Sequence, residues 1–149
     1  MSVYSFSTGA IIQFDTRTIT NLGQGQYLKI VRDAPAYTNV KGGLGDSAYL
    51  ANIDATKFTI TLSLFKGSED AKFLTDIYNE NLLAFQQNDY AILSRTHTIT
   101  AKTLTSEFTG SNIKISNMEN LVVADSQNSG ADEVSKVIFT FICPDGFLI

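Results

Sequence analysis

Residues 57–83 read KFTITLSLFKGSEDAKFLTDIYNENLL, and this stretch decides the fold. Its first eight residues alternate between polar and apolar side chains, and successive side chains of a β-strand point to opposite faces. The apolar face that this alternation predicts comprises Phe58, Ile60, Leu62 and Leu64. The opposite, hydroxyl-rich face comprises Lys57, Thr59, Thr61 and Ser63. We therefore expect a strand that turns one face to the core.

A short helix is predicted directly after this strand. Gly67 interrupts the extended run, Ser68 is a typical N-cap, and Glu69 and Asp70 complement the positive end of a helix dipole. Apolar residues then recur at helical spacing, namely Phe73, Leu74, Ile77 and Tyr78. A helix of about three turns is not stable alone in water. We expect it to pack against the apolar face of the preceding strand.

Length and composition favour one domain, residues 1–149, with an unusually neutral surface. Charged residues make up 17% of the chain, against about 25% in an average domain. Such a composition fits a threonine-rich β protein, or a protein whose surface is largely covered by copies of itself. Cys143 is the only cysteine, so no internal disulfide is possible. Its apolar surroundings in the sequence predict a small core residue.

Charge and hydropathy exclude several classes of function. The net charge is −4 and the basic residues are scattered, which argues against binding nucleic acid through its phosphates. No apolar run approaches the length of a membrane-spanning helix, so we expect no membrane insertion. The first residues, MSVYSFSTGAIIQF, lack the basic start and long apolar core of a signal peptide. Synthesis in the cytoplasm is the simplest expectation.

The segment before the deciding stretch predicts a strand and then a long loop. YLKIVR, residues 27–32, reads as a strand that ends near Pro35. Residues 37–56 are polar, hold several glycines and show no period, which predicts an irregular connection of a length that is usually functional. Tyr49, Leu50 and Ile53 are too apolar for a solvated linker. They indicate a contact surface for a partner, unless they fold back on the chain's own core.

The C-terminal half predicts further strands. We expect a turn at residues 85–88, and strands at 90–93, 97–104, around 108–115 with a turn near Gly110, at 118–123 and at 134–143. The total is about seven to nine short strands and one helix. The predicted fold class is therefore mainly β: an antiparallel β-sandwich or barrel with one short flanking α-helix.

No motif in the sequence indicates catalysis, a cofactor or a metal. His97 is the only histidine, and a lone histidine without cysteine ligands does not make a zinc site. KGGLGDS, residues 41–47, lacks the GK[ST] ending of a phosphate-binding loop. The acidic residues are too dispersed for a calcium loop. An enzyme with paired carboxylates, of the glycosidase kind, stays open as an alternative because strands can bring distant residues together.

The order of the segments resembles the inner tail tube proteins of contractile-tailed bacteriophages and the related tube proteins of type VI secretion. The segments that carry the resemblance are YLKIVRDAP (27–35), VKGGLGDSAYLANIDATK (40–57), FTITLSLF (58–65) and GSEDAKFLTDIYNENL (67–82). Residues 134–143 fit more loosely. The combination of these segments is specific for the family, whereas no single one of them is.

The resemblance implies a non-enzymatic, structural subunit of the virion. Six copies would close into a ring, with their inner sheets joined into one β-barrel around a pore. Rings would stack into a tube inside a contractile sheath, and DNA would pass through the pore during ejection without specific binding. Sheath, tape-measure, baseplate and tail terminator proteins are the other partners that such a tube implies.

Two sets of residues receive roles under this hypothesis. The long loop would make the contacts between stacked rings, through Gly43, Asp46, Tyr49, Leu50 and Ile53. The polar face of Lys57, Thr59, Thr61 and Ser63 would suit a water-filled lumen. The alternatives are a secretion-type tube or ring protein, and a monomeric β-barrel that binds a small ligand.

Overall fold

The computed structural model describes residues 11–20, 22, 27–103, 105–120 and 136–149. The described strands pair in antiparallel fashion throughout, which confirms the predicted fold class. The strands are β1 (Ile11–Phe14), β2 (Arg17–Ile19), β3 (Leu28–Arg32), β4 (Tyr37–Lys41), β5 (Ser47–Ala51), β6 (Phe58–Phe65), β7 (His97–Lys102), β8 (Glu107–Asn120), β9 (Lys136–Cys143) and β10 (Asp145–Leu148). The helices are α1 (Glu69–Gln87), α2 (Tyr90–Leu93) and the 3-10 helix η1 (Ile53–Thr56).

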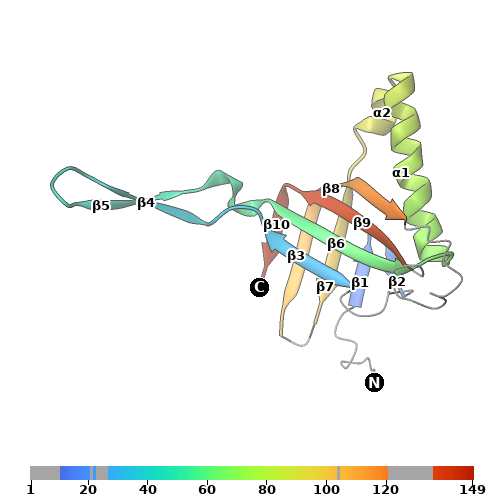
Figure 1. The fold of residues 1–149 in the computed structure, drawn as a ribbon, viewed down its shortest axis with the longest axis horizontal. Helices are drawn as coiled ribbons and strands as arrows, with labels where there is room; N and C mark the ends of the chain where they lie inside the picture. Colours follow the sequence, from blue (N-terminus) through green and yellow to red (C-terminus); the bar gives the residue numbers. More distant parts are fainter. Residues whose placement is uncertain (1–10, 21, 23–26, 104, 121–135) are drawn as a thin grey trace, which may run out of the picture.

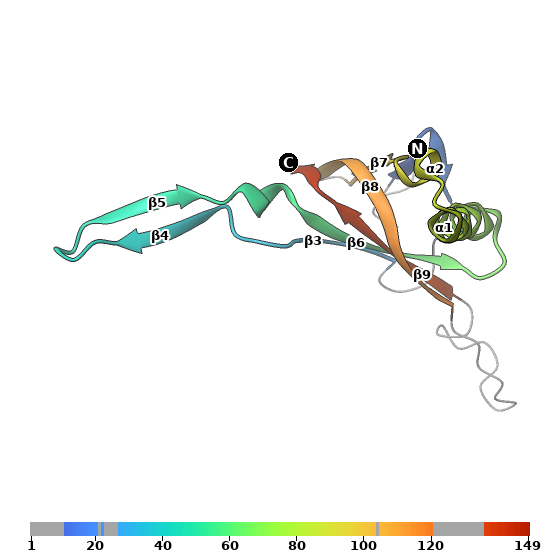
Figure 2. The same cartoon turned by 90° about the horizontal axis from the view of Figure 1, so that it is seen from above.

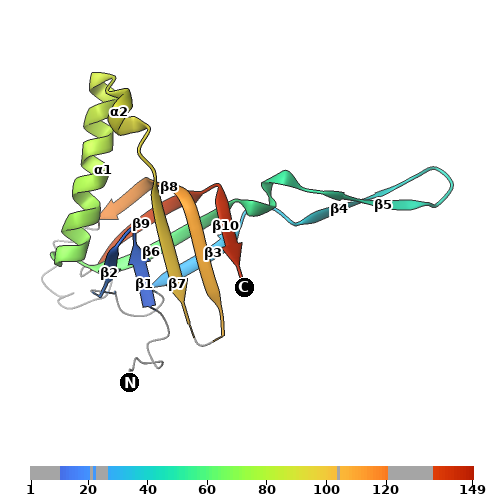
Figure 3. The ribbon, with the colours of Figure 1, turned by 180° about the vertical axis from the view of Figure 1, so that it is seen from behind.

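Two layers of strands share the long strand β8. The first half of β8 pairs with β7 and β10, and its second half pairs with β9, so the strand order is β2-β1-β7-β8-β9-β6-β3 with β10 beside β8. We call β2-β1-β7-β8-β10 the first sheet and β8-β9-β6-β3 the second sheet. Strand β8 bends where Asn112 has a positive φ of 58° and the register with β7 shifts. The strands of the two sheets cross steeply (Figures 1 and 3).

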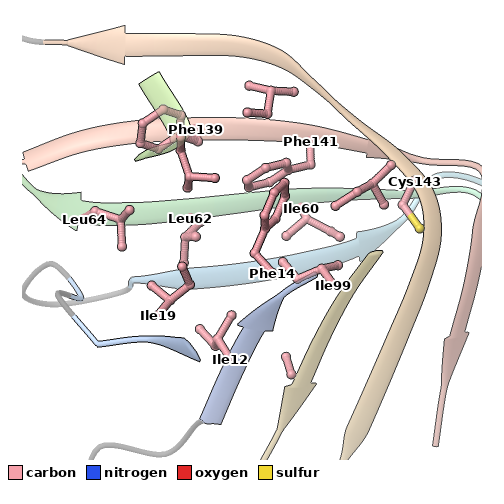
Figure 4. Close-up of a cluster of buried hydrophobic side chains, with 14 of the residues drawn as sticks. Ile12, Phe14, Ile19, Ile60, Leu62, Leu64, Ile99, Phe139, Phe141 and Cys143 are labelled. Carbon is pink, nitrogen blue, oxygen red and sulfur yellow. The ribbon is translucent and has the colours of Figure 1, made fainter. Parts of the chain in front are cut away.

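The core lies between these two sheets and is filled with aromatic and aliphatic side chains (Figure 4). The rings of Phe14 on β1 and Phe141 on β9 are 5.7 Å apart, and those of Phe58 and Phe108 are 5.0 Å apart. Cys143 is fully buried, which confirms it as a core residue, and burial raises the pKa of its thiol. The thiol is therefore held in its protonated, unreactive form at neutral pH.

Strand β6 lies inside the second sheet, and α1 follows it directly. Strand β6 pairs with β3 on one side and β9 on the other, and its four apolar residues are at most 1% exposed. Ser68 then caps α1 by accepting a hydrogen bond from the Ala71 amide at 3.2 Å. Leu74 is buried and Phe73 and Ile77 pack partly buried against the core. In β6 and at the start of α1, the local sequence signals and the tertiary packing therefore agree.

The helix is longer than predicted, and the turn expected at residues 85–88 is wrong. Helix α1 continues to Gln87 and ends only at Asn88, which takes the left-handed conformation. The amide-rich run near Asn79 does not stop it, because no glycine or proline breaks the helix there. The strand predicted at 90–93 is also wrong. Asp89 caps the short helix α2, accepting from the Ile92 amide at 3.5 Å.

The turn expected near Gly110 is wrong as well, because β8 runs through it. A side-chain carbon at Gly110 would lie 2.8 Å from the sulfur of Cys143, so this glycine marks a close approach within the core. Met118 belongs to the same strand, and residues 121–123 of the predicted next strand lie outside the described residues. The final predicted strand is β9, of which residues 134 and 135 also lie outside.

Candidate functional site

The segment at residues 37–56 is not an irregular loop but a β-hairpin that projects from the molecule. Strands β4 and β5 pair in register from Tyr37 opposite Ala51 to Lys41 opposite Ser47. The tip is closed by a hydrogen bond from the Gly45 amide to the Gly42 carbonyl at 3.1 Å, and Gly45 has a φ of +89° that favours glycine. We call residues 37–51 the arm. It extends away from both sheets (Figures 1 and 2).

The arm has no core of its own. Every residue of β4 and β5 is exposed, although the arm carries large apolar side chains. These are Tyr37, Val40, Leu44, Tyr49 and Leu50, exposed by 64%, 47%, 96%, 72% and 58%. An isolated two-stranded hairpin is marginally stable at best in water. We therefore expect such a ribbon to be stabilised when another surface covers one of its faces and buries its apolar side chains.

The base of the arm, in contrast, is held firmly against the second sheet. The Asn52 amide donates to the Ala36 carbonyl at 2.8 Å, and the Asn52 side chain caps η1 by accepting from Asp54 at 3.0 Å. Arg32 donates to the Ala55 carbonyl and lies over the ring of Phe58. The direction in which the arm leaves the molecule is thus set by packed and hydrogen-bonded residues.

The outer face of the second sheet carries the polar stripe of β6. Thr61 lies between Lys29 on β3 and Thr140 on β9, while Thr59 lies between Val31 and Ile142. Thr59 also donates a hydrogen bond to Asp33 at 2.7 Å. Ser63 differs from its neighbours on this face, because it is only 4% exposed. The stripe that is accessible to solvent therefore comprises Lys57, Thr59 and Thr61.

Strands β3 and β10 are two of the edge strands of the described sheets, and their outer edges offer unpaired backbone groups. Among the described strands, β3 pairs with β6 alone and β10 pairs with β8 alone. Strand β10 also exposes Phe147 and Leu148. Exposed edges with apolar side chains are sites of strand addition unless they are covered. Both edges are therefore candidates for contacts with another chain.

A further exposed apolar cluster lies at the far end of α1, and it was missed from the sequence. Leu82, Leu83, Phe85 and Tyr90 are all exposed, and α2 packs back against this end of the helix. The signal was present in the sequence, because Leu82 and Phe85 continue the helical spacing of Leu74 and Tyr78. The predicted turn at residues 85–88 excluded Phe85 from the helix, so this spacing was not recognised.

The residues predicted for stacking and for the lumen occupy different parts of the structure. Gly43, Asp46, Tyr49 and Leu50 lie in the arm, whereas Ile53 begins η1 at its base. Lys57 follows η1 directly, and Thr59 and Thr61 lie on β6 beyond this base. Sequence reasoning missed Tyr37, Val40 and Leu44 as members of the same exposed ribbon.

Chemically reactive groups do not gather in the described part of the molecule. His97 lies 2.8 Å from Asp15, Nδ1 to Oδ2, beside the ring of Phe14. No cluster of three or more histidine, cysteine, aspartate or glutamate residues is placed to hold a metal ion among the described residues. In the part of the chain that the structure describes, no helix has both the length and the apolar character needed to cross a membrane.

No protein-family model and no curated protein matches the sequence. Solved structures do match the fold. A chain from the sheath/tube terminator of the extracellular contractile injection system PVC, in the extended state, aligns with a TM-score of 0.60 and 14% identity, covering 100% of this chain and 96% of that chain. A chain from the PVC sheath-tube complex, also extended, gives 0.58 and 12%, covering 99% and 91%.

A third similar structure is the anti-feeding prophage cap, a tube-terminating cap, with a TM-score of 0.56, 14% identity, and coverage of 100% of this chain and 91% of that chain. All three alignments span nearly the whole of both chains. The chain therefore has the fold found in components of contractile injection systems.

Proposed function

We propose that this chain is a structural subunit of the tube of a contractile machine, and specifically of a phage tail tube. Six copies close into a ring, and rings stack into a hollow tube inside a contractile sheath. The observation that carries the proposal is the arm, an apolar two-stranded ribbon without a core of its own. The shared fold with injection-system components supports the same reading.

The physical reason for assembly is that the single chain is an incomplete β structure. The outer edge of β3 has no partner among the described strands, and the arm exposes apolar side chains to water. A contact between two different surfaces of identical copies closes into a ring when the rotation allows it. Ring closure would cover the sheet edges, and stacking would cover the arm through Gly43, Asp46, Tyr49, Leu50 and the nearby Ile53.

The outer face of the second sheet is the surface that suits the lumen. Thr59 and Thr61 give it an uncharged, hydroxyl-rich centre, and the charges around it are mixed, with Lys29 and Lys57 near Asp33 and Asp54. Such a face has no dense array of basic groups to neutralise phosphates. DNA would pass over it without being retained.

Other roles within the same class of machine differ in their partners. In a phage, sheath, tape-measure, baseplate and tail terminator proteins would contact the tube, and the virion tail is the location. A secretion-type tube would carry another cargo through the same structure. The names of two similar structures, a sheath/tube terminator and a tube-terminating cap, favour a second candidate, a ring that ends the tube.

Electron microscopy of the purified protein at high concentration tests the proposal. A tube subunit gives six-fold rings that stack into tubes with an open pore, and a reconstruction would place Thr61 at the lumen. A terminator gives single rings that do not stack. A species that stays monomeric at every concentration, with a melting point raised by small apolar ligands, would favour the ligand-binding alternative instead.

The variant Tyr49→Asp tests the arm within the same experiment. A charge buried without a partner opposes contact, so we expect the concentration needed for tube formation to rise by at least about tenfold. Circular dichroism should be unchanged, because Tyr49 is exposed in the single chain. Thr105→Asp, which adds the same charge at an exposed turn away from the arm, is the control. Tubes of Tyr49→Asp at the wild-type concentration would remove Tyr49 and its face of the arm from the proposal.

A further inference from the structure

Helix α1 overhangs the sheets on which it lies. Its 19 residues span about 28 Å. In the first half, Leu74 is fully buried and Thr75 contacts Met118 on β8. Phe85 follows Leu74 by three helical turns and so points in nearly the same direction, yet it is 73% exposed. The apolar face thus continues beyond the point where the chain's own sheets end (Figure 1).

The overhang is apolar at its centre, and most of the polar residues around it are uncharged. Leu82 and Phe85 are exposed there, while the neighbouring Ala84 is 2% exposed and α2 packs against α1. Most of the polar residues around them are amides: Asn79, Asn81, Gln86 and Gln87. The nearby Glu80 is already paired with Arg95 at 3.0 Å. Covering this surface therefore requires little desolvation of free charge.

One face of the arm has the complementary shape and chemistry. The cross-strand pairs Thr38–Leu50 and Val40–Ala48 share one face of the ribbon, and none of these four residues is charged. A strand of five residues spans about 17 Å, and the ten residues from Tyr78 to Gln87 span about 15 Å of helix. The ribbon is a small sheet without a covering layer, and the end of α1 is a helix without a sheet beneath it. Packing one on the other would form the usual arrangement of a helix on a sheet.

We infer that the arm of one copy docks, through its Val40–Leu50 face, on the α1 overhang of a second copy. The inference rests on the proposed self-assembly and names the surface that receives the arm. The two surfaces lie at opposite ends of one chain, so they do not meet within it (Figures 1 and 3). They meet when copies are arranged head to tail, which is the contact that closes a ring or extends a stack.

Cross-linking between two single-cysteine additions tests this contact. Val40→Cys and Phe85→Cys are made in separately tagged proteins and mixed, as minor components, into wild-type protein that is then assembled and treated with a short bismaleimide. The native Cys143 does not interfere, because it is buried and its raised pKa keeps it protonated. Leu83→Cys is the matched control, since Leu83 is also exposed but points away from the Leu74–Phe85 face.

We expect at least roughly tenfold more cross-linked heterodimer from Val40→Cys with Phe85→Cys than with Leu83→Cys, because linkage needs the two side chains close together and aimed at each other. Thr38→Cys with Leu82→Cys, a second pair across the same contact, should behave like the first. Equal yields for the two helix positions, or no product in samples that contain assembled particles, would overturn the inference and leave the proposed function standing. Samples without assembled particles would overturn both.

Discussion

At the scale of single residues, Asp70 has two roles, of which the sequence indicates only one. It is a favourable charge at the start of a helix, and it also binds residues that are distant in the sequence. The sequence predicts Asp70 as a favourable charge in the first turn of the helix, and it is there. The structure adds that it is 3% exposed and accepts hydrogen bonds from Arg17 at 2.8 Å and from the Thr20 amide at 2.9 Å. Asp70 therefore joins the start of α1 to the β1–β2 hairpin. No sequence pattern predicts this contact between Arg17 and Asp70, which are 53 positions apart.

We predict that Arg17→Met destabilises the protein by about 2 kcal/mol, because it leaves a buried carboxylate with one charged partner fewer. Methionine keeps much of the aliphatic packing against Phe73, over whose ring the guanidinium lies at 4.8 Å. Arg95→Met is the control, since its pair with Glu80 is exposed and should contribute less than about 1 kcal/mol. Urea unfolding measures both, and equal losses would contradict the role given to Asp70.

Gly146 is a second residue whose role only the structure reveals. Gly146 lies within β10, opposite Gly110 on β8. A side-chain carbon there would overlap the ring of Phe58 and lie 3.1 Å from Phe108. We predict that Gly146→Ala costs about 2 kcal/mol through overpacking. Gly43→Ala in the arm meets nothing within 4 Å and should change the urea midpoint little.

At the scale of elements, the alternation in FTITLSLF and the serine cap were sufficient to predict β6 and the start of α1. Both rest on local chemistry that the fold reinforces. The arm could not be predicted in this way. Tyr37 and Val40 lie on opposite faces of β4, and both are exposed, so no alternation marks the strand. A segment that covers no core of its own carries no hydrophobic period.

The end of α1 lies beyond the point that the sequence predicts, and its cap can be tested directly. Asn88 stops the helix with φ 54° and ψ 40°, and its amide donates to the carbonyl groups of Ala84 and Phe85. Asn88→Gly should leave stability unchanged or slightly improved, because glycine adopts this conformation freely. Asn88→Ala should cost about 1 kcal/mol in urea unfolding. Equal stabilities of the two variants would show that the cap does not fix the helix end.

At the scale of the whole molecule, the fold class followed from the sequence because the strand-forming segments are numerous and the single long helix is strongly capped. The relation between the two sheets did not follow. It depends on one strand, β8, that bends at Asn112 and serves both layers. That the two apolar surfaces lie at opposite ends of the molecule also emerges only when the chain is folded, since only η1, β6 and the first part of α1 separate the arm from the exposed end of α1 in the sequence.

The central claim is that the single chain is completed only by identical neighbours, and hydrogen exchange measures this most directly. Amide exchange would be compared in dilute protein, where copies are separate, and in concentrated protein containing assembled particles. The account predicts that amides of the arm and of β3 exchange at least about tenfold more slowly in the assembled sample, while those of β6 and β9 change little. Equally fast exchange of the arm and β3 in both samples would contradict it.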